Sequence, residues 1–139
     1  IGTNDLAKDL GTRTRAALTL SLQHCLLAAR AAGIVAIDGV YNAYKDEDGL
    51  RAECEDGRDM GFDGKSLIHP AQVEIANAAF GPTAVEIDLA RRQIAAFDAA
   101  VAAGQGVAVV DGRIVENLHI VTARATLAKA EAITALERT

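Results

Sequence analysis

The sequence has few of the residues that build sites from sulfur or from aromatic rings. Among its 139 residues there are two cysteines, three phenylalanines, two tyrosines and no tryptophan. Neither Cys25 nor Cys54 lies in a Cys-x-x-Cys motif or near a histidine at ligand spacing. We therefore expect two reduced thiols in a cytoplasmic protein, rather than a disulfide framework or a zinc site. Because half of the residues are hydrophobic but only 4% are aromatic, aliphatic side chains must supply most of the core.

The sequence also lacks a block of basic residues and a long apolar run. Fourteen Lys and Arg residues against nineteen Asp and Glu give a formal net charge of −5, which argues against binding to nucleic acid or to an anionic membrane. No stretch approaches the ~18 apolar residues needed to cross a membrane. The first residues also do not show the basic segment and cleavage site typical of a signal peptide. Since Ile1 is not a methionine, we expect the sequence to begin partway through a longer protein.

Helix-forming segments and short apolar runs alternate through the first 81 residues. The expected elements are a strand end entering a loop over 1–6, helices over 13–32, 48–60 and 70–79, and strands over 34–37 and 65–68. The run from Ile34 to Ile37 has no polar alternation, which is typical of a strand buried on both faces. The order helix, strand, helix, strand with short connections predicts consecutive βα units of a parallel sheet.

A different pattern follows after residue 81. The expected elements there are a helix over 84–103, a hairpin over 107–115 and a helix from 116 to about 138. Thr83 and Glu86 form a capping-box pattern at the start of the first helix, and Asp111-Gly112 predicts the tight turn of the hairpin. We therefore divide the chain into βα units at residues 1–81 and a helix–hairpin–helix segment at residues 82–139.

Polar residues stand at the ends of three expected strands: Asp5, Asp38 and His69. Enzymes built on parallel sheets place their sites at this edge. Asp5 could bind Mg²⁺, which prefers carboxylate and water oxygens, or could be a solvated loop acid or a helix cap. His69 could bind a ligand or complete a turn, and Glu116 could stabilise the start of the last helix without a catalytic role. The residues alone leave these alternatives open.

Short motifs follow one another in a recognisable order along nearly the whole chain. They are 2–6 (Gly-Thr-Asn-Asp-Leu), 9–11, 28–33, 36–39 (Ala-Ile-Asp-Gly), 61–65 (Gly-Phe-Asp-Gly-Lys), 68–73 (Ile-His-Pro-Ala-Gln-Val) and 110–116. This order resembles the C-terminal half of the citrate lyase β-subunit and malyl-CoA lyase family, the HpcH/HpaI aldolase-like barrels. The resemblance implies an α/β fold, namely the C-terminal part of a (β/α)₈ TIM barrel followed by a lid segment.

The resemblance also implies residue roles. Asp5 matches a metal-binding aspartate, while Ile68 and His69 match residues that contact the acyl-CoA substrate. Glu116 falls where the family usually has an aspartate in the lid, a general acid/base that acts in a neighbouring subunit's site. Asp38 is a further substrate-binding candidate because of its place at a strand end. The second metal ligand of the family, a glutamate, is expected upstream of the first residue.

The function implied by the resemblance is that of a Mg²⁺-dependent lyase. It would cleave or form a carbon–carbon bond in a 3-hydroxyacyl-CoA, such as malyl-CoA or citryl-CoA, giving acetyl-CoA and a 2-oxo acid. We expect a cytoplasmic homo-oligomer, a trimer or hexamer, that binds neither nucleic acid nor membrane. Because Glu116 is one methylene longer than aspartate, two alternatives stay open. These are a thioesterase acting on the same CoA esters and a non-catalytic subunit for acyl-CoA binding or assembly.

Overall fold

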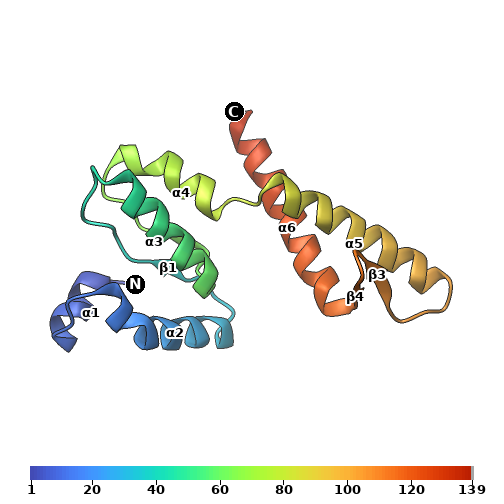
Figure 1. Cartoon of the computed structure of the whole chain (residues 1–139), viewed down its shortest axis with the longest axis horizontal. Coiled ribbons are helices and arrows are strands. Elements are labelled where there is room, and N and C mark those ends of the chain that lie inside the picture. Colours follow the sequence, from blue (N-terminus) through green and yellow to red (C-terminus); the bar gives the residue numbers. More distant parts are fainter. Residues whose placement is uncertain (139) are drawn as a thin grey trace. The chain divides into compact units, whose positions relative to one another are not determined.

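Helices dominate the chain, and two short two-stranded sheets accompany them in a mixed α/β fold (Figure 1). The computed structural model describes residues 1–138. It divides into two compact units, unit 1 at Ile1–Phe80 and unit 2 from Gly81 onward. This division falls one residue before the boundary expected from the sequence.

Unit 1 alternates helices with two short parallel strands. Its elements are α1 (Thr3–Leu10), α2 (Arg15–Ala31), β1 (Ile37–Asp38), α3 (Glu47–Met60), β2 (Gly64–Lys65), the 3-10 helix η1 (Pro70–Gln72) and α4 (Val73–Phe80). Strands β1 and β2 pair in parallel, with Asp38 opposite Lys65. The predicted parallel pairing is therefore confirmed. The strands expected over 34–37 and 65–68 are shorter than predicted, because β1 and β2 each hold only two paired residues and share one residue each with the expected segments.

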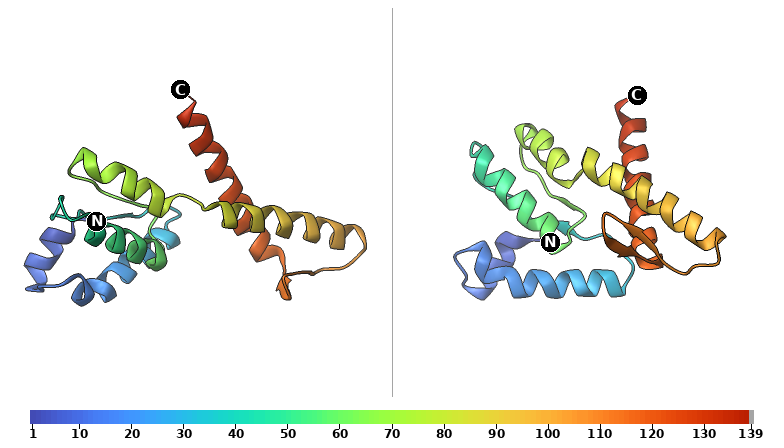
Figure 2. Two further views of the ribbon diagram at one scale, coloured as in Figure 1. Left: turned by 45° about the horizontal axis from the view of Figure 1, so that its top comes forward. Right: turned by 45° about the vertical axis from the view of Figure 1, so that its right-hand side comes forward.

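The core of unit 1 is aliphatic, as the composition predicts. Helix α2 buries one stripe of side chains at three- and four-residue spacing: Leu18, Leu22, Leu26 and Ala29. Helix α3 contributes Leu50 and Cys54 to the same core and packs beside α4 (Figure 2). Helices α3 and α4 both contact β2.

The first residues form a helix, α1, and the expected strand end over 1–6 is wrong. A lone strand needs backbone partners along its length, whereas a helix satisfies its bonds internally. Asp5 in the first turn and Lys8 in the last turn also favour this helix through the helix dipole. The amino group of Ile1 donates a hydrogen bond to the backbone oxygen of Ile37 at 2.8 Å, so the start of the chain still lies beside β1.

The run before β1 is not buried on both faces, contrary to expectation. Ile34 and Val35 are 60% and 70% exposed, and only Ala36 of this run is fully buried. Within residues 1–138, β2 is the only strand that pairs with β1. The apolar run 34–37 therefore predicted packing on both of its faces, which the described residues do not supply.

Local signals placed most helix ends correctly. Asp46 caps α3 by accepting a hydrogen bond from the backbone N–H of Gly49 at 3.0 Å. Gly33 and Gly61, which follow α2 and α3, adopt the left-handed conformation with φ of 66° and 110° that glycine tolerates at helix ends. The helix expected over 70–79 begins as the tighter η1 before continuing as α4.

Unit 2 has the expected order of helix, hairpin and helix. Its elements are α5 (Ala84–Ala102), β3 (Ala108–Val110), β4 (Arg113–Val115) and α6 (Asn117–Glu137). Strands β3 and β4 pair antiparallel, and Asp111 and Gly112 between them both have positive φ, which is the geometry of a primed hairpin turn. Thr83 and Glu86 form the predicted capping box of α5.

The structure describes the state of both cysteines and the character of the helices. Cys25 is exposed, Cys54 is buried, and both are free thiols. Burial raises the pKa of the Cys54 thiol, which keeps it protonated and unreactive. None of the helices within residues 1–138 combines the length and apolar character that crossing a bilayer requires.

Candidate functional site

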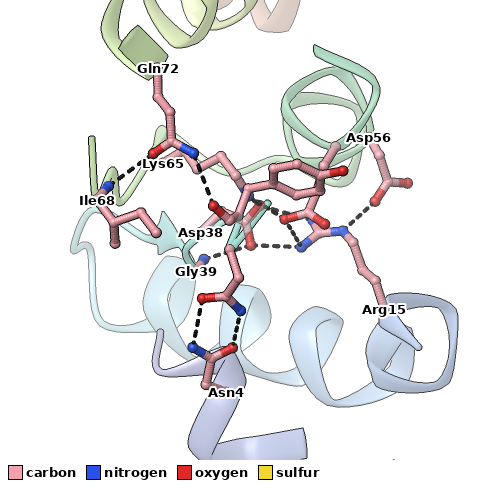
Figure 3. Close-up of polar contacts among 11 residues, drawn as sticks. Asn4, Arg15, Asp38, Gly39, Asp56, Lys65, Ile68 and Gln72 are labelled. Atoms are coloured by element: carbon pink, nitrogen blue, oxygen red, sulfur yellow. Dashed lines mark hydrogen bonds and ion pairs between the residues drawn. The ribbon is translucent and has the colours of Figure 1, made fainter. Parts of the chain in front are cut away.

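Five charged side chains meet around the end of β1, inside unit 1 (Figure 3). Asp38 on β1 lies at the centre and is fully buried. Its Oδ2 accepts a hydrogen bond from Lys65 Nζ at 2.9 Å, and its Oδ1 accepts one from Arg15 Nη1 at 3.0 Å. Arg15 Nε donates to Asp56 at 2.7 Å, and Lys65 Nζ donates to Glu53 at 2.7 Å. The cluster ties both strands to α2 and α3.

The electrostatics of this cluster depend on close pairing. The Lys65 side chain is 0% exposed, and a buried ammonium is tolerated only when carboxylates compensate its charge. Burial by itself lowers the pKa of Arg15, but hydrogen bonds to Asp38 and Asp56 more than offset this, so the pKa is raised. Arg15 therefore stays charged at neutral pH.

Asp38 lies at the end of β1, as the sequence predicted, but its carboxylate is already engaged. Besides Lys65 and Arg15, the backbone N–H of Gly39 donates to Asp38 Oδ1 at 2.8 Å. The side chain thus fixes the direction in which the chain leaves β1. Its substrate-binding role stays a prediction.

The loop over residues 39–46, which follows β1, contacts α1 through side chains. The amides of Asn4 and Asn42 exchange two hydrogen bonds, of 3.2 Å and 2.8 Å, and Figure 3 shows Asn4 directed from α1 toward this loop. Gly39 lies so close to the Thr3 side chain that an added Cβ would overlap it. Since Asp5 follows Asn4 directly, these contacts hold the α1 backbone beside Asp5 against the 39–46 loop.

A buried glutamine joins the same loop to the segment after β2. Gln72 is 0% exposed. Its Nε2 donates to the backbone oxygen of Tyr41 at 2.9 Å, and its Oε1 accepts from the backbone N–H of Ile68 at 2.9 Å. Both ends of this amide are satisfied, so Gln72 holds the Ile68–His69 backbone against the 39–46 loop.

His69 lies exposed at the start of η1. Its Nδ1 accepts a hydrogen bond from the backbone N–H of Ala71 at 3.2 Å. Its ring stacks on Tyr44, with 4.6 Å between the ring centroids. Beside it, the Ile68 side chain is 52% exposed. The two residues predicted to contact substrate therefore lie together on the surface of unit 1.

Asp5 lies in the first turn of α1, not at a strand end as the sequence predicted. Its side chain is exposed and makes no hydrogen bond or ion pair to any of the described residues. Within residues 1–138 no three His, Cys, Asp or Glu side chains form a group able to hold a metal. Mg²⁺ commonly takes one or two carboxylates and completes its octahedron with water and substrate oxygens. The metal-binding role of Asp5 stays a prediction.

Glu116 belongs to unit 2, so it is not one of the residues that unit 1 brings together. It is exposed at the N-cap of α6. Its backbone N–H donates to His119 Nδ1 at 3.1 Å, which fixes the start of the helix. The exposed side chain lies at the junction of the β3–β4 hairpin and α6, and its catalytic role stays a prediction.

Sequence reasoning missed the residues that support the site. Lys65 and Gln72 lie in the motifs that carry the family resemblance, so a signal existed, but no role was assigned to them. Arg15, Glu53 and Tyr44 gave no signal, because their partners lie far away in the sequence. For example, Arg15 and Asp38 are 23 residues apart.

Comparisons with known proteins show what this chain is similar to. The chain is 72% identical over 138 residues to "(3S)-malyl-CoA thioesterase" from Cereibacter sphaeroides, covering 97% of this chain and 48% of the relative. It is 39% identical to citrate lyase subunit beta of Escherichia coli K12, covering 94% and 44%. The solved structure of CitE from Mycobacterium tuberculosis, in complex with magnesium, acetoacetate and coenzyme A, superposes with a TM-score of 0.79 at 29% identity, covering 94% and 50%. The chain thus spans about half the length of the curated relatives it matches.

These relatives correct the main functional expectation. The resemblance implied a carbon–carbon lyase, but the relatives that are 72% identical are named thioesterases. The lyase assignment is therefore contradicted, and the hydrolytic alternative is favoured. The family itself is the expected one. Residues 1–70, just over half of the chain, match the HpcH/HpaI aldolase/citrate lyase family, and the chain belongs to that family.

Proposed function

We propose that the protein is a Mg²⁺-dependent thioesterase that hydrolyses (3S)-malyl-CoA to malate and CoA. The observation that carries this proposal is the 72% identity, over 97% of the chain, to a protein named for that activity. The free Asp5 carboxylate and the exposed Ile68–His69 pair of unit 1 support it, because they offer one metal ligand and one substrate contact on the same unit.

In this proposal Asp5 holds Mg²⁺, which when bound supplies a Lewis acid that polarises acyl-CoA oxygens. Ile68 offers apolar surface to the substrate, and His69 offers a ring nitrogen for a hydrogen bond. Asp38, paired with Lys65 and Arg15, supports the loop that places these groups. None of these side chains needs to change its charge during the reaction.

Glu116 is the proposed acid/base. Hydrolysis forms a bond between the oxygen of water and the acyl carbon and breaks the carbon–sulfur bond. The Glu116 carboxylate takes a proton from the attacking water and returns it to the departing sulfur, which leaves as the CoA thiol. Such proton transfer contributes about 10²- to 10⁴-fold to rates.

The test is to supply purified protein with (3S)-malyl-CoA and Mg²⁺ and to identify the products. We expect free CoA thiol and malate in equal amounts. Release of acetyl-CoA with a 2-oxo acid would contradict the proposal, and binding of the CoA ester without turnover would favour a non-catalytic subunit. Glu116→Gln should lower kcat by at least about 10²-fold, whereas Glu137→Gln, an exposed acid on the same helix, should leave it unchanged.

We further propose that unit 1 is the C-terminal part of a (β/α)₈ barrel and that unit 2 is a lid that also mediates oligomerisation. The parallel β1 and β2, each followed by a helix, support the barrel, because its strands and helices alternate in this way. The lid of one subunit would then reach the site of its neighbour in a trimer or hexamer.

Subunit mixing tests this assembly. Asp5→Asn and Glu116→Gln should each be inactive alone. If the lid acts in a neighbouring subunit, mixing the two variants under subunit exchange should restore part of the activity, because some sites then combine an intact Asp5 with an intact Glu116. A mixture that stays inactive despite verified exchange would contradict the arrangement.

A further inference from the structure

Tyr44 is an aromatic residue that lies outside the hydrophobic core. Its side chain is 42% exposed, and its hydroxyl makes no hydrogen bond to any of residues 1–138. The ring instead stacks on His69, with an interplanar angle of 30°, and Lys45 Nζ lies 5.7 Å from the ring centroid. Its contacts therefore point to a role in holding the imidazole.

The hydrogen bonding of His69 defines what the imidazole can do. A backbone N–H can only donate, so the Ala71 N–H requires that Nδ1 of His69 accept. In the neutral ring the proton then resides on Nε2. His69 thus presents Nε2–H as a hydrogen-bond donor, a group suited to a carbonyl or carboxylate oxygen of an acyl-CoA.

The backbone and the ring of His69 are restrained by different residues. Gln72 fixes the preceding residue through the backbone N–H of Ile68, but it does not touch the imidazole. The ring torsion of a histidine is broad, and a single bond of 3.2 Å to Ala71 restrains it weakly. The flat face of Tyr44 supplies the missing restraint, because offset stacking favours one ring orientation.

We propose that Tyr44 is a positioning residue, which holds the His69 imidazole so that its Nε2–H meets the acyl-CoA substrate. This inference rests on the proposed function, because it takes His69 to be a substrate contact. The 39–46 loop then serves both halves of the site, since Asn42 in the same loop bonds to Asn4 beside Asp5.

Two substitutions of Tyr44 separate the effect of its ring stacking from the effect of its hydroxyl group. Tyr44→Phe keeps the aromatic face and should leave KM for malyl-CoA unchanged. Tyr44→Ala removes it and should raise KM by about 2- to 10-fold, the range expected for one aromatic pair, with little change in the denaturation midpoint because the ring is exposed. An unchanged KM in Tyr44→Ala, or an equal rise in Tyr44→Phe, would overturn the proposal.

A double-mutant cycle shows whether Tyr44 acts through His69. In a His69→Ala background, Tyr44→Ala should have no further effect on KM, because the positioned group is gone. If the two effects multiply, Tyr44 acts independently of His69 and the proposal is wrong.

NMR of the imidazole distinguishes failure of this inference from failure of the proposed function. In the wild-type protein the ¹⁵N shifts of His69 should report the Nε2–H form, and its ring protons should carry a ring-current shift that Tyr44→Phe keeps and Tyr44→Ala removes. Absence of the ring-current shift would refute the stack whether or not malyl-CoA is hydrolysed. A normal stack in a protein that does not hydrolyse malyl-CoA would refute the proposed function, and with it the substrate role of Tyr44.

Discussion

At the scale of single residues, the charged side chains of unit 1 differ in whether they have a partner. Buried charges are paired and hold the fold together, whereas Asp5 is exposed and unpaired within the described residues. Lys65 and Asp38 are buried and paired, which joins β2 to β1. An exposed carboxylate without a protein partner can bind a cation at a lower desolvation cost than a buried, paired one.

Asp5→Asn should weaken Mg²⁺ binding and lower turnover, because an amide oxygen carries no charge to attract the ion. Titration of Mg²⁺ against malyl-CoA hydrolysis measures both effects. We expect the Mg²⁺ concentration for half-maximal activity to rise at least about 10-fold, since even mutations of residues that only support metal ligands commonly cost that much. Asp9→Asn is the matched control, since Asp9 is another exposed acid of α1. Equal behaviour of the two variants would remove Asp5 from the metal site.

Gly57 in α3 allows the charged cluster to pack. A Cβ there would lie 2.8 Å from Asp38 Oδ2, and that oxygen is held by Lys65. Although glycine to alanine in a helix interior normally gains about 1 kcal/mol, we expect Gly57→Ala to lower the free energy of unfolding by about 1–3 kcal/mol through overpacking. Urea denaturation measures this.

Gly106→Ala is the control for that substitution. A Cβ at Gly106 meets no atom within 4 Å, and its φ is not left-handed. We therefore expect its free energy of unfolding to stay near the wild-type value. A Gly57→Ala protein as stable as this control would mean that the cluster can move aside.

At the scale of elements, most helices begin and end where local chemistry places them. The α3 cap is an example, because Asp46 accepts from the Gly49 N–H and from the Tyr41 hydroxyl at 2.6 Å. The hydrogen bond from Tyr41, and then that from Gly49, hold the pKa of Asp46 below its usual value of 3.8. The same bond raises the pKa of Tyr41.

This lowered pKa predicts an acid dependence of stability. A carboxyl whose folded pKa is below its unfolded value contributes stability that is fully present above the unfolded pKa and is lost as pH falls through the folded pKa. The urea midpoint of the wild-type protein should therefore drop more steeply below pH 4 than that of Asp46→Asn, which cannot titrate. Circular dichroism at 222 nm follows the transition.

Tyr41→Phe provides the matched control for the cap. It removes the largest cause of the lowered Asp46 pKa while keeping the carboxylate and the bond from Gly49. Its acid dependence should fall between those of the wild type and Asp46→Asn. If all three proteins lose stability in parallel, Asp46 does not contribute to the acid transition.

At the scale of the whole molecule, the described chain leaves one apolar edge uncovered. Ile34 and Val35 precede β1 and are 60% and 70% exposed, and β1 pairs with a single strand within residues 1–138. Apolar side chains beside an unpaired strand edge favour association. The same edge is where further strands of the proposed barrel would pair.

The 139-residue chain by itself should therefore bind a hydrophobic dye and associate as its concentration rises. Val35→Lys should reduce both effects, because a charge on a strand edge opposes pairing. Val85→Lys, a change at a 77% exposed valine on α5, should reduce neither. Dye fluorescence and sedimentation velocity measure the two responses, and equal behaviour of both variants would show that this edge is not the associating surface.

The sequence by itself determined the features that depend on neighbours within a few residues. The helix caps at Thr83 and Asp46, the hairpin turn at Asp111-Gly112 and the buried stripe of α2 are of this kind. Each is decided by short-range hydrogen bonds, positive φ or a 3.6-residue period. The motif order that carries the family resemblance is likewise a property of the chain alone.

Only the tertiary structure decided which residues the site uses and how. Asp38 pairs with Arg15 and Lys65, which lie 23 and 27 residues away, and His69 stacks on Tyr44 from another loop. The helix at Thr3–Leu10 replaced an expected strand for the same reason, since a strand exists only where a partner pairs with it. Local sequence does not encode these partners, because burial and pairing between distant segments arise only when the helices pack.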